Sequence, residues 1–95
     1  MKSARVSVAE WSKSVFYVYV IESVKSRKRY TGLTGKTPED RLKEYNKGTT
    51  TWTRKERPFR LIYWEKHTSR DIARRRERYL KSGKGRETIS KLIPA

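Results

Sequence analysis

The chain has 95 residues and a mass of 11.3 kDa, enough for one small domain around a single hydrophobic core. Its 25 lysine and arginine residues outnumber 10 acidic residues, so the net charge is +15 at pH 7. This charge argues against a neutral metabolic enzyme and indicates a polyanionic partner. Nucleic acid is the first candidate, ahead of an anionic membrane surface or the ribosome.

The residue types that the chain lacks exclude several kinds of site. Without cysteine it has no disulfide framework, no disulfide-linked partner, no thiolate zinc site and no thiol catalysis. Its single histidine, His67, leaves no histidine cluster for a metal and no support for a Ser-His-Asp triad. No apolar stretch is long enough to span a membrane, and residues 1–15 lack the apolar core of a signal peptide. We therefore expect a cytoplasmic protein without a membrane partner.

The first half of the chain predicts a β-hairpin. Residues 1–15 have weak periodicity and predict a flexible extension or a short helix, ahead of a single domain over 16–95. The aromatic and β-branched run at 16–21 predicts a strand that is covered on both faces. A polar loop and a second strand at 29–34 follow, so the two strands are expected to pair antiparallel.

Cap residues define the first helix. Thr37 and Pro38 suit the cap and the first helical position, and Gly48 suits a left-handed stop, which predicts a helix between them. A polar and basic stretch that ends in a proline comes next and predicts an irregular loop. The third strand is expected at 59–65.

The last third of the chain predicts two helices. Ser69 is a capping residue for a long helix that runs through about Ser82. The glycines at 83 and 85 predict a break, and a short last helix is expected over 86–93. The order ββαβαα predicts an α+β fold, in which a three-stranded antiparallel sheet is flanked by helices.

Glu77 is an unusual acid in the long helix. At 100° per residue, it falls at the margin of the expected buried arc, in a helix otherwise rich in arginine. The apolar residues of that arc are Ile72, Ala73, Tyr79 and Leu80. Arg76 also falls within the arc, so it needs a buried acceptor. A half-buried carboxylate at a cleft suits Mg²⁺ together with phosphate oxygens and waters. The alternative is that Glu77 only neutralises its arginine neighbours.

Four short motifs in chain order resemble those of the GIY-YIG nuclease family. They are Tyr17-Val18-Tyr19, then Tyr30-Thr31-Gly32, then Arg41 in the following helix, and Glu77 within Ala73 to Lys81. The resemblance covers about Phe16 to Ile93. It extends to the small stand-alone bacterial members, in which a segment like Tyr79 to Glu87 follows the glutamate.

The resemblance implies hydrolysis of DNA phosphodiester bonds with one divalent cation, Mg²⁺ or Mn²⁺. Carried over position by position, Glu77 is the metal ligand and Arg41 holds the scissile phosphate. Tyr19 or Tyr30 acts as the base and the other orients water or phosphate, and the sequence leaves this choice open. Branched, damaged or single-stranded DNA is the expected substrate, as in DNA repair, and RNA is the alternative partner.

The first motif reads Tyr-Val-Tyr in place of Gly-Ile-Tyr, which the small members of the family commonly tolerate. Three further features depart from the family pattern. Leu33 stands where several of these nucleases have a lysine, Tyr45 stands where a histidine is common, and no asparagine follows Glu77. These departures favour weak or lost activity. They support a second hypothesis, in which the chain is a non-catalytic nucleic-acid-binding module with the same fold.

Two groups of residues outside the motifs are expected to contact nucleic acid. The loop before the third strand combines an aromatic ring with cations, which suits base stacking and phosphate binding. The cations near the last helix have little acid around them. The residues are Trp52, Arg54, Lys55 and Arg57 in the loop, and Lys81, Lys84 and Arg86 near the last helix. For Trp52, the alternative is that it covers the edge of the core.

Overall fold

The computed structural model describes residues 15–93 of the chain. Its elements are β1 (Phe16–Ser23), β2 (Arg29–Thr34), α2 (Pro38–Lys47), the short 3-10 helix η1 (Arg54–Glu56), β3 (Phe59–His67), α3 (Arg70–Lys81) and α4 (Gly83–Leu92). This order confirms the predicted α+β fold. The extension expected over 1–15 lies, apart from Val15, outside the described residues. Within the described part of the chain, no helix has the length and apolar character needed to cross a membrane.

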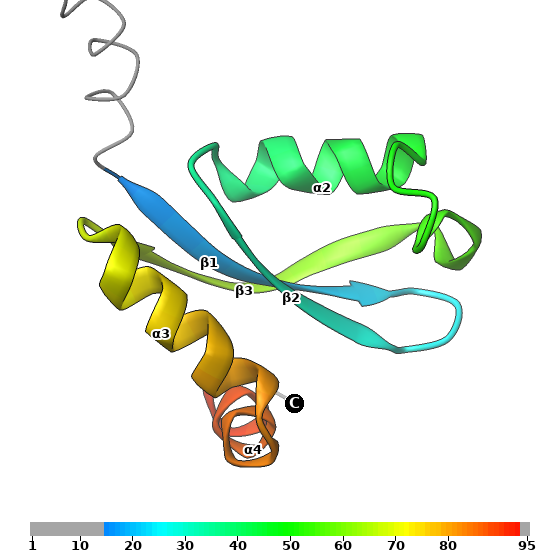
Figure 1. The fold of residues 1–95 in the computed structure, drawn as a ribbon. Helices are drawn as coiled ribbons and strands as arrows, with labels where there is room; N and C mark the ends of the chain where they lie inside the picture. Colours follow the sequence, from blue (N-terminus) through cyan, green and yellow to red (C-terminus); the bar gives the residue numbers. More distant parts are fainter. Residues whose placement is uncertain (1–14, 94–95) are drawn as a thin grey trace, which may run out of the picture.

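The three strands form one antiparallel sheet with β1 in the centre, in the order β2-β1-β3. Figure 1 shows α2 on one face of this sheet and α3 with α4 on the other. Because β1 has a strand on each side and helices on both faces, its residues from Val18 to Ser23 are all buried. The continuous apolar run at 16–21 predicted such a strand.

Alternate residues of β1 feed two separate hydrophobic clusters, as the two-residue period of a strand requires. Val18 and Val20 face α3 and α4, where they pack with Ala73, Leu80 and Ile89. The next residues point the other way, toward α2. That second cluster contains Tyr19, Ile21 and Phe59, with Tyr30, Leu42, Tyr45 and Leu61 packed against it.

The predicted break at 83–85 is wrong, because α4 begins at Gly83 directly after α3. Ser82 ends one helix and caps the next, and its hydroxyl accepts a hydrogen bond from the Gly85 amide at 3.2 Å. Gly85 is buried, and a Cβ there would lie 2.6 Å from the carbonyl carbon of Tyr79. Glycine therefore lets α4 pack directly on the end of α3.

The buried face of α3 is narrower than the sequence predicts. Ala73 and Leu80 are buried in the core, whereas Ile72 is 52% exposed and Tyr79 is 39% exposed. The expectation that these last two residues face inward is wrong. A three-stranded sheet covers only a thin stripe of the helix, and the hydroxyl of Tyr79 lies 2.9 Å from the Thr88 hydroxyl of α4 instead.

Arg76 has an acceptor on the neighbouring strand, although this acceptor is only partly buried. Its Nε donates to a carboxylate oxygen of Glu65 on β3 at 2.8 Å. The same carboxylate accepts a hydrogen bond from the Tyr63 hydroxyl and pairs with the His67 ring at 2.7 Å. Burial alone would raise the pKa of Glu65, but these three partners together lower it. The cluster joins α3 to the edge strand β3.

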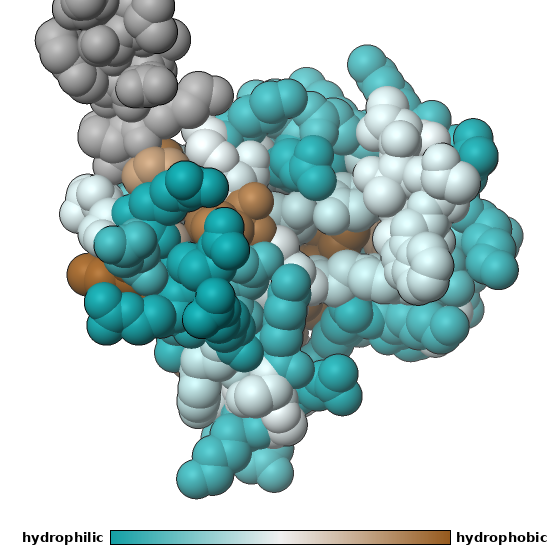
Figure 2. Space-filling model, in the orientation of Figure 1, coloured by the Kyte–Doolittle hydropathy of each residue, from teal (hydrophilic) through white to brown (hydrophobic). Residues whose placement is uncertain are grey.

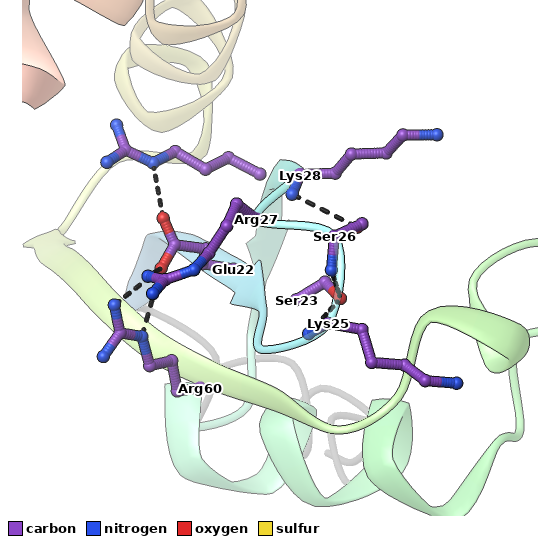
Figure 3. A network of polar contacts seen from close by, with 8 residues as sticks. Glu22, Ser23, Lys25, Ser26, Arg27, Lys28 and Arg60 are labelled. Atoms are coloured by element: carbon purple, nitrogen blue, oxygen red, sulfur yellow. Dashed lines mark hydrogen bonds and ion pairs between the residues drawn. The ribbon is translucent and has the colours of Figure 1, made fainter.

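Arginine side chains around one buried carboxylate fix the end of the β1–β2 hairpin (Figure 3). Glu22 is 5% exposed, and its oxygens lie 2.7 Å from Arg60 Nη2, 3.1 Å from Arg29 Nε and 3.6 Å from Arg27 Nη1. The Arg60 guanidinium is the main reason why the pKa of Glu22 is lowered. The network joins both neighbours of β1, because Arg29 lies on β2 and Arg60 on β3.

Candidate active site

Tyr19 lies at the centre of the α2 face of the sheet and is only 1% exposed. Its hydroxyl lies 3.0 Å from the Tyr45 hydroxyl, and Arg41 Nε donates to it at 3.4 Å. The first motif therefore contacts the arginine of α2 directly.

The helix α2 places Arg41 and Tyr45 together because they are four residues apart. The Arg41 guanidinium carbon lies 5.1 Å from the centre of the Tyr45 ring, and Arg41 also pairs with Glu44. Thr37 fixes the start of this helix, since its hydroxyl accepts from the Asp40 amide. Tyr45, which the sequence marked only as a departure, is thus a direct partner of both site residues.

Burial raises the pKa of Tyr19, and the hydrogen bond with Tyr45 raises it further. Arg41 opposes both effects without overcoming them. Among the groups of the protein itself, the balance therefore raises the pKa of Tyr19. Its hydroxyl keeps its proton at neutral pH, so it suits donation to a phosphate or a water better than proton abstraction.

The second motif lies on the same face, on the edge strand β2. Tyr30 is half-buried, and its ring meets Phe59 edge to face at 5.8 Å. Gly32 is the register partner of Tyr19, and a Cβ at Gly32 would lie 2.5 Å from Tyr19 Cζ. Only glycine leaves room for the Tyr19 ring against β2.

Glu77 lies on α3 in a groove of about 860 Å³ beside the end of β2. Its side chain is 15% exposed and pairs with Lys81 at 3.1 Å and with Arg74 at 3.9 Å. Other cations of the groove are Arg70 and Arg78. The expected position of Glu77 at the margin of the buried face is confirmed. Its two ion pairs are also those expected if Glu77 only neutralises its cationic neighbours.

The family resemblance implies one cleft for all four motif residues, but the sheet separates Glu77 from Tyr19, Tyr30 and Arg41. Tyr19 and Arg41 lie on the α2 face, whereas α3 covers the opposite face. Gly32 contacts Tyr19 on one side of β2, and the next residue, Leu33, lines the groove of Glu77 on the other. Among residues 15–93, no hydrogen bond or ion pair links Glu77 to Tyr19, Tyr30 or Arg41.

The donor set of the groove fits a cation that keeps most of its own water. The described residues contain no group of three or more His, Cys, Asp or Glu side chains that could enclose a metal ion. Glu77 is a single carboxylate in an open groove lined by cations that attract phosphate. Mg²⁺ is commonly held by one or two carboxylates with substrate phosphates and waters, so the residues present suit it.

The loop before β3 is exposed as expected for a nucleic-acid contact. Trp52 is 81% exposed, which rules out the alternative that it covers the core. Arg54 and Lys55 are exposed in the short helix η1, and Arg57 follows it. The loop is held in place by Glu56, whose backbone carbonyl accepts from the Ser23 hydroxyl at 2.7 Å.

A second groove, of about 680 Å³, lies between β2 and α4. It is lined by two of the predicted cations, Lys81 and Arg86, and by three that the sequence did not single out, Arg27, Lys28 and Arg29. Lys84 is exposed in the first turn of α4. Figure 2 shows strongly hydrophilic side chains gathered over α3, where Arg70, Arg74 and Arg78 recur every four residues. That spacing is the signal that could have identified the helix face from the sequence.

Comparison with known proteins identifies the domain. The family model for the GIY-YIG catalytic domain matches residues 15–90, which is most of the chain and includes all four motifs. No curated protein and no solved structure matches the chain significantly. The chain therefore belongs to the GIY-YIG family of nucleases.

Proposed function

We propose that the chain is a metal-dependent endonuclease that hydrolyses phosphodiester bonds of DNA. Branched, damaged or single-stranded DNA is the substrate that we favour, as a DNA repair nuclease would meet, and RNA is the alternative. The family assignment supports the reaction class. The net charge of +15 supports a polyanionic substrate.

One observation carries this proposal: the Tyr19 hydroxyl is held by Arg41 and Tyr45 directly over the backbone of β2. A phosphate bound at this edge strand would have Arg41 on one side of β2. On the other side it would have the groove of Glu77, which begins at Leu33. The substrate itself would then bridge the two parts of the site.

Arg41 suits the scissile phosphate because a guanidinium can give two parallel hydrogen bonds to phosphate oxygens. It would also stabilise the charge that develops as water attacks. Tyr19, which keeps its proton, would donate to the same phosphate or orient the water. Tyr30 is then the better candidate for the base, since it lies on the same face of the sheet and is only half-buried.

Glu77 would hold the divalent cation together with phosphate oxygens and waters. A bound cation supplies charge stabilisation at the phosphate and makes a water easier to deprotonate. Lys81 would have to release the Glu77 carboxylate, or share it, when substrate and cation bind. The arginines of α3 would hold the flanking phosphates in the same groove.

A specific observation also favours the second candidate, a non-catalytic nucleic-acid-binding module. Glu77 is engaged by Lys81 at 3.1 Å, and Leu33 gives its groove an apolar side chain where several family nucleases have lysine. A carboxylate used only to balance nearby cations would have this arrangement. The basic grooves would serve binding equally well without chemistry.

Cleavage of supercoiled plasmid and of branched DNA tests the proposal. We expect nicking or cutting with Mg²⁺ or Mn²⁺ and none after chelation of the metal. DNA binding in the presence of chelator, measured by a mobility shift, shows that the preparation is active in binding. A protein that binds these DNAs and cuts none of them with either metal would leave the binding module as its function.

A further inference from the structure

Two aromatic rings lie open to solvent on the α2 face of the sheet, beside Tyr19. Trp64 is in the middle of β3 and is 48% exposed, although it is a large aromatic residue in a strand. The ring of Tyr17 on β1 meets it edge to face, with centroids 5.7 Å apart and planes at 69°. Tyr17 is itself only partly buried. Tyr17 belongs to the first motif without a role assigned to it, and Trp64 lies outside the motifs.

The edge-to-face packing of Tyr17 and Trp64 leaves ring faces that no other aromatic ring in the pair covers. In an edge-to-face pair, the edge of one ring covers one face of the other, so the remaining ring faces have no aromatic partner. The neighbouring cluster on this face is different, because Tyr19 and Phe59 are 1% and 4% exposed. Within residues 15–93, the core on this side of the sheet therefore stops short of Trp64.

Cations flank these rings, which points to the chemistry of a ligand. Lys66 is exposed and is the register partner of Tyr17 across β1 and β3. Trp64 is the register partner of Tyr19, whose hydroxyl accepts from Arg41. The Tyr19 hydroxyl lies over β2, on the side of β1 away from β3, so Arg41 lies on the same face of the sheet with the Tyr19 ring between it and Trp64. A ligand with one flat apolar ring and a nearby anion fits this surface.

We propose that Tyr17 and Trp64 form a stacking platform for an unpaired nucleobase. The platform rests on the proposed function in one respect, because another phosphate of the same strand as the stacked base would be the one that Arg41 holds. Bases of an intact duplex are stacked inside it, so the platform selects nucleotides that are single-stranded or displaced from a helix. It therefore gives the active site a preference for unpaired substrate.

Fluorescence of Trp64 tests the platform directly. In a full-length variant with Trp11→Phe and Trp52→Phe, Trp64 is the one remaining tryptophan of the chain. We expect short oligothymidylate to quench its emission, and an abasic oligomer of the same length and charge to leave it unchanged. A duplex of the same length should bind through its phosphates without quenching. The measurement is made with chelator, so that no cleavage occurs.

Affinities of variants of this protein provide the second readout. Stacking of one base contributes about 1–3 kcal/mol, so Trp64→Leu should weaken oligothymidylate about 5- to 150-fold and leave the abasic oligomer unaffected. Trp64→Phe keeps a ring and should retain most of the affinity. Tyr79→Leu removes an exposed aromatic ring from the other face and serves as the matched control. Thermal melting establishes that each variant is folded.

The outcomes separate the platform from the proposed function. Equal affinity for oligothymidylate and the abasic oligomer, with no quenching, would overturn the platform while DNA binding stands. Loss of binding to every oligonucleotide would overturn both. If Trp64 emission changes with protein concentration but not with added nucleic acid, the Tyr17–Trp64 surface binds a second copy of the chain. That result would also overturn the platform.

Discussion

The ring of Tyr19 occupies the space that a side chain at Gly32 would need. Gly32 is its register partner on β2, and a Cβ there would lie 2.5 Å from Tyr19 Cζ. The first and second motifs therefore pack directly on each other. The absence of a side chain at Gly32 allows the Tyr19 hydroxyl to lie close to the backbone of β2.

Gly32→Ala should therefore impair catalysis without abolishing DNA binding. The added methyl group pushes the Tyr19 hydroxyl away from Arg41, and a misplacement of about 1 Å can cost about a hundredfold in rate. Single-turnover cleavage against a mobility-shift affinity measures the two effects separately. Gly83→Ala, in which the added Cβ has nothing within 4 Å, is the matched glycine control. Unchanged cleavage by Gly32→Ala would show that the position of the Tyr19 hydroxyl does not matter.

Local sequence signals predicted most of the fold because they report local structure. The cap at Thr37, the stop at Gly48 and the apolar run of β1 each act within a few residues, and the observed elements agree with them. The region around Gly85 was predicted wrongly, because its packing on Tyr79 depends on how two helices meet. Propensity alone reads a glycine there as a break.

The sequence suggests the members of the candidate site but not their arrangement. The family resemblance proposes Tyr19, Arg41 and Glu77, and the first two form a hydrogen bond. Whether α3 lies on the same face of the sheet as α2 depends on chain crossings that motif spacing does not contain. The raised pKa of Tyr19 likewise follows from burial by residues distant in sequence, including Tyr45.

The two glycines of α4 should respond differently to the same substitution. A Cβ at Gly85 meets the backbone of α3, which cannot move without separating the helices, so Gly85→Ala should destabilise the protein by at least about 2 kcal/mol. Nothing lies within 4 Å of a Cβ at Gly83, so Gly83→Ala should be neutral or stabilise by up to about 1 kcal/mol. Urea unfolding of both variants checks this. Equal stabilities would contradict the close packing of α4 on α3.

Glu22→Gln should lower the stability of the protein at neutral pH and make that stability depend less on pH in the acid range. The folded-state pKa of Glu22 is lowered, chiefly by Arg60, so the carboxylate stabilises the fold above its unfolded pKa of about 4.3. This contribution is lost as the pH falls through the folded pKa. Weakening the charge-assisted hydrogen bonds should cost about 1–2 kcal/mol at pH 7.

Melting temperature measured from neutral to acid pH tests the role of Glu22. The wild-type and Glu22→Gln curves should converge as the pH falls below the folded pKa. The exposed acid Glu87 in α4, which lies outside the first turn of its helix, provides the control, and Glu87→Gln should melt close to the wild type. A constant gap between the Glu22→Gln and wild-type curves would mean that ionisation of Glu22 contributes nothing.

DNA affinity should fall steeply with salt, because the grooves and the loop before β3 hold phosphates mainly through lysine and arginine. If about six phosphates are neutralised, affinity should fall roughly a thousandfold between 50 and 200 mM salt. Arg86→Ala, which removes one cation of the second groove, should lower the slope by about one charge. A salt response close to flat would contradict a phosphate-binding role for these surfaces.

The most direct test of the endonuclease proposal is single-turnover cleavage by Glu77→Ala at saturating protein, with Mg²⁺ and with Mn²⁺. Glu87→Ala, which removes an exposed acid from α4, is the matched control. We expect Glu77→Ala to lose at least about a hundredfold in cleavage rate while it binds DNA as well as the wild type in chelator, and Glu87→Ala to cleave normally. Cleavage by Glu77→Ala at the wild-type rate, with the same metal requirement, would contradict the assignment of Glu77 and with it the proposed site.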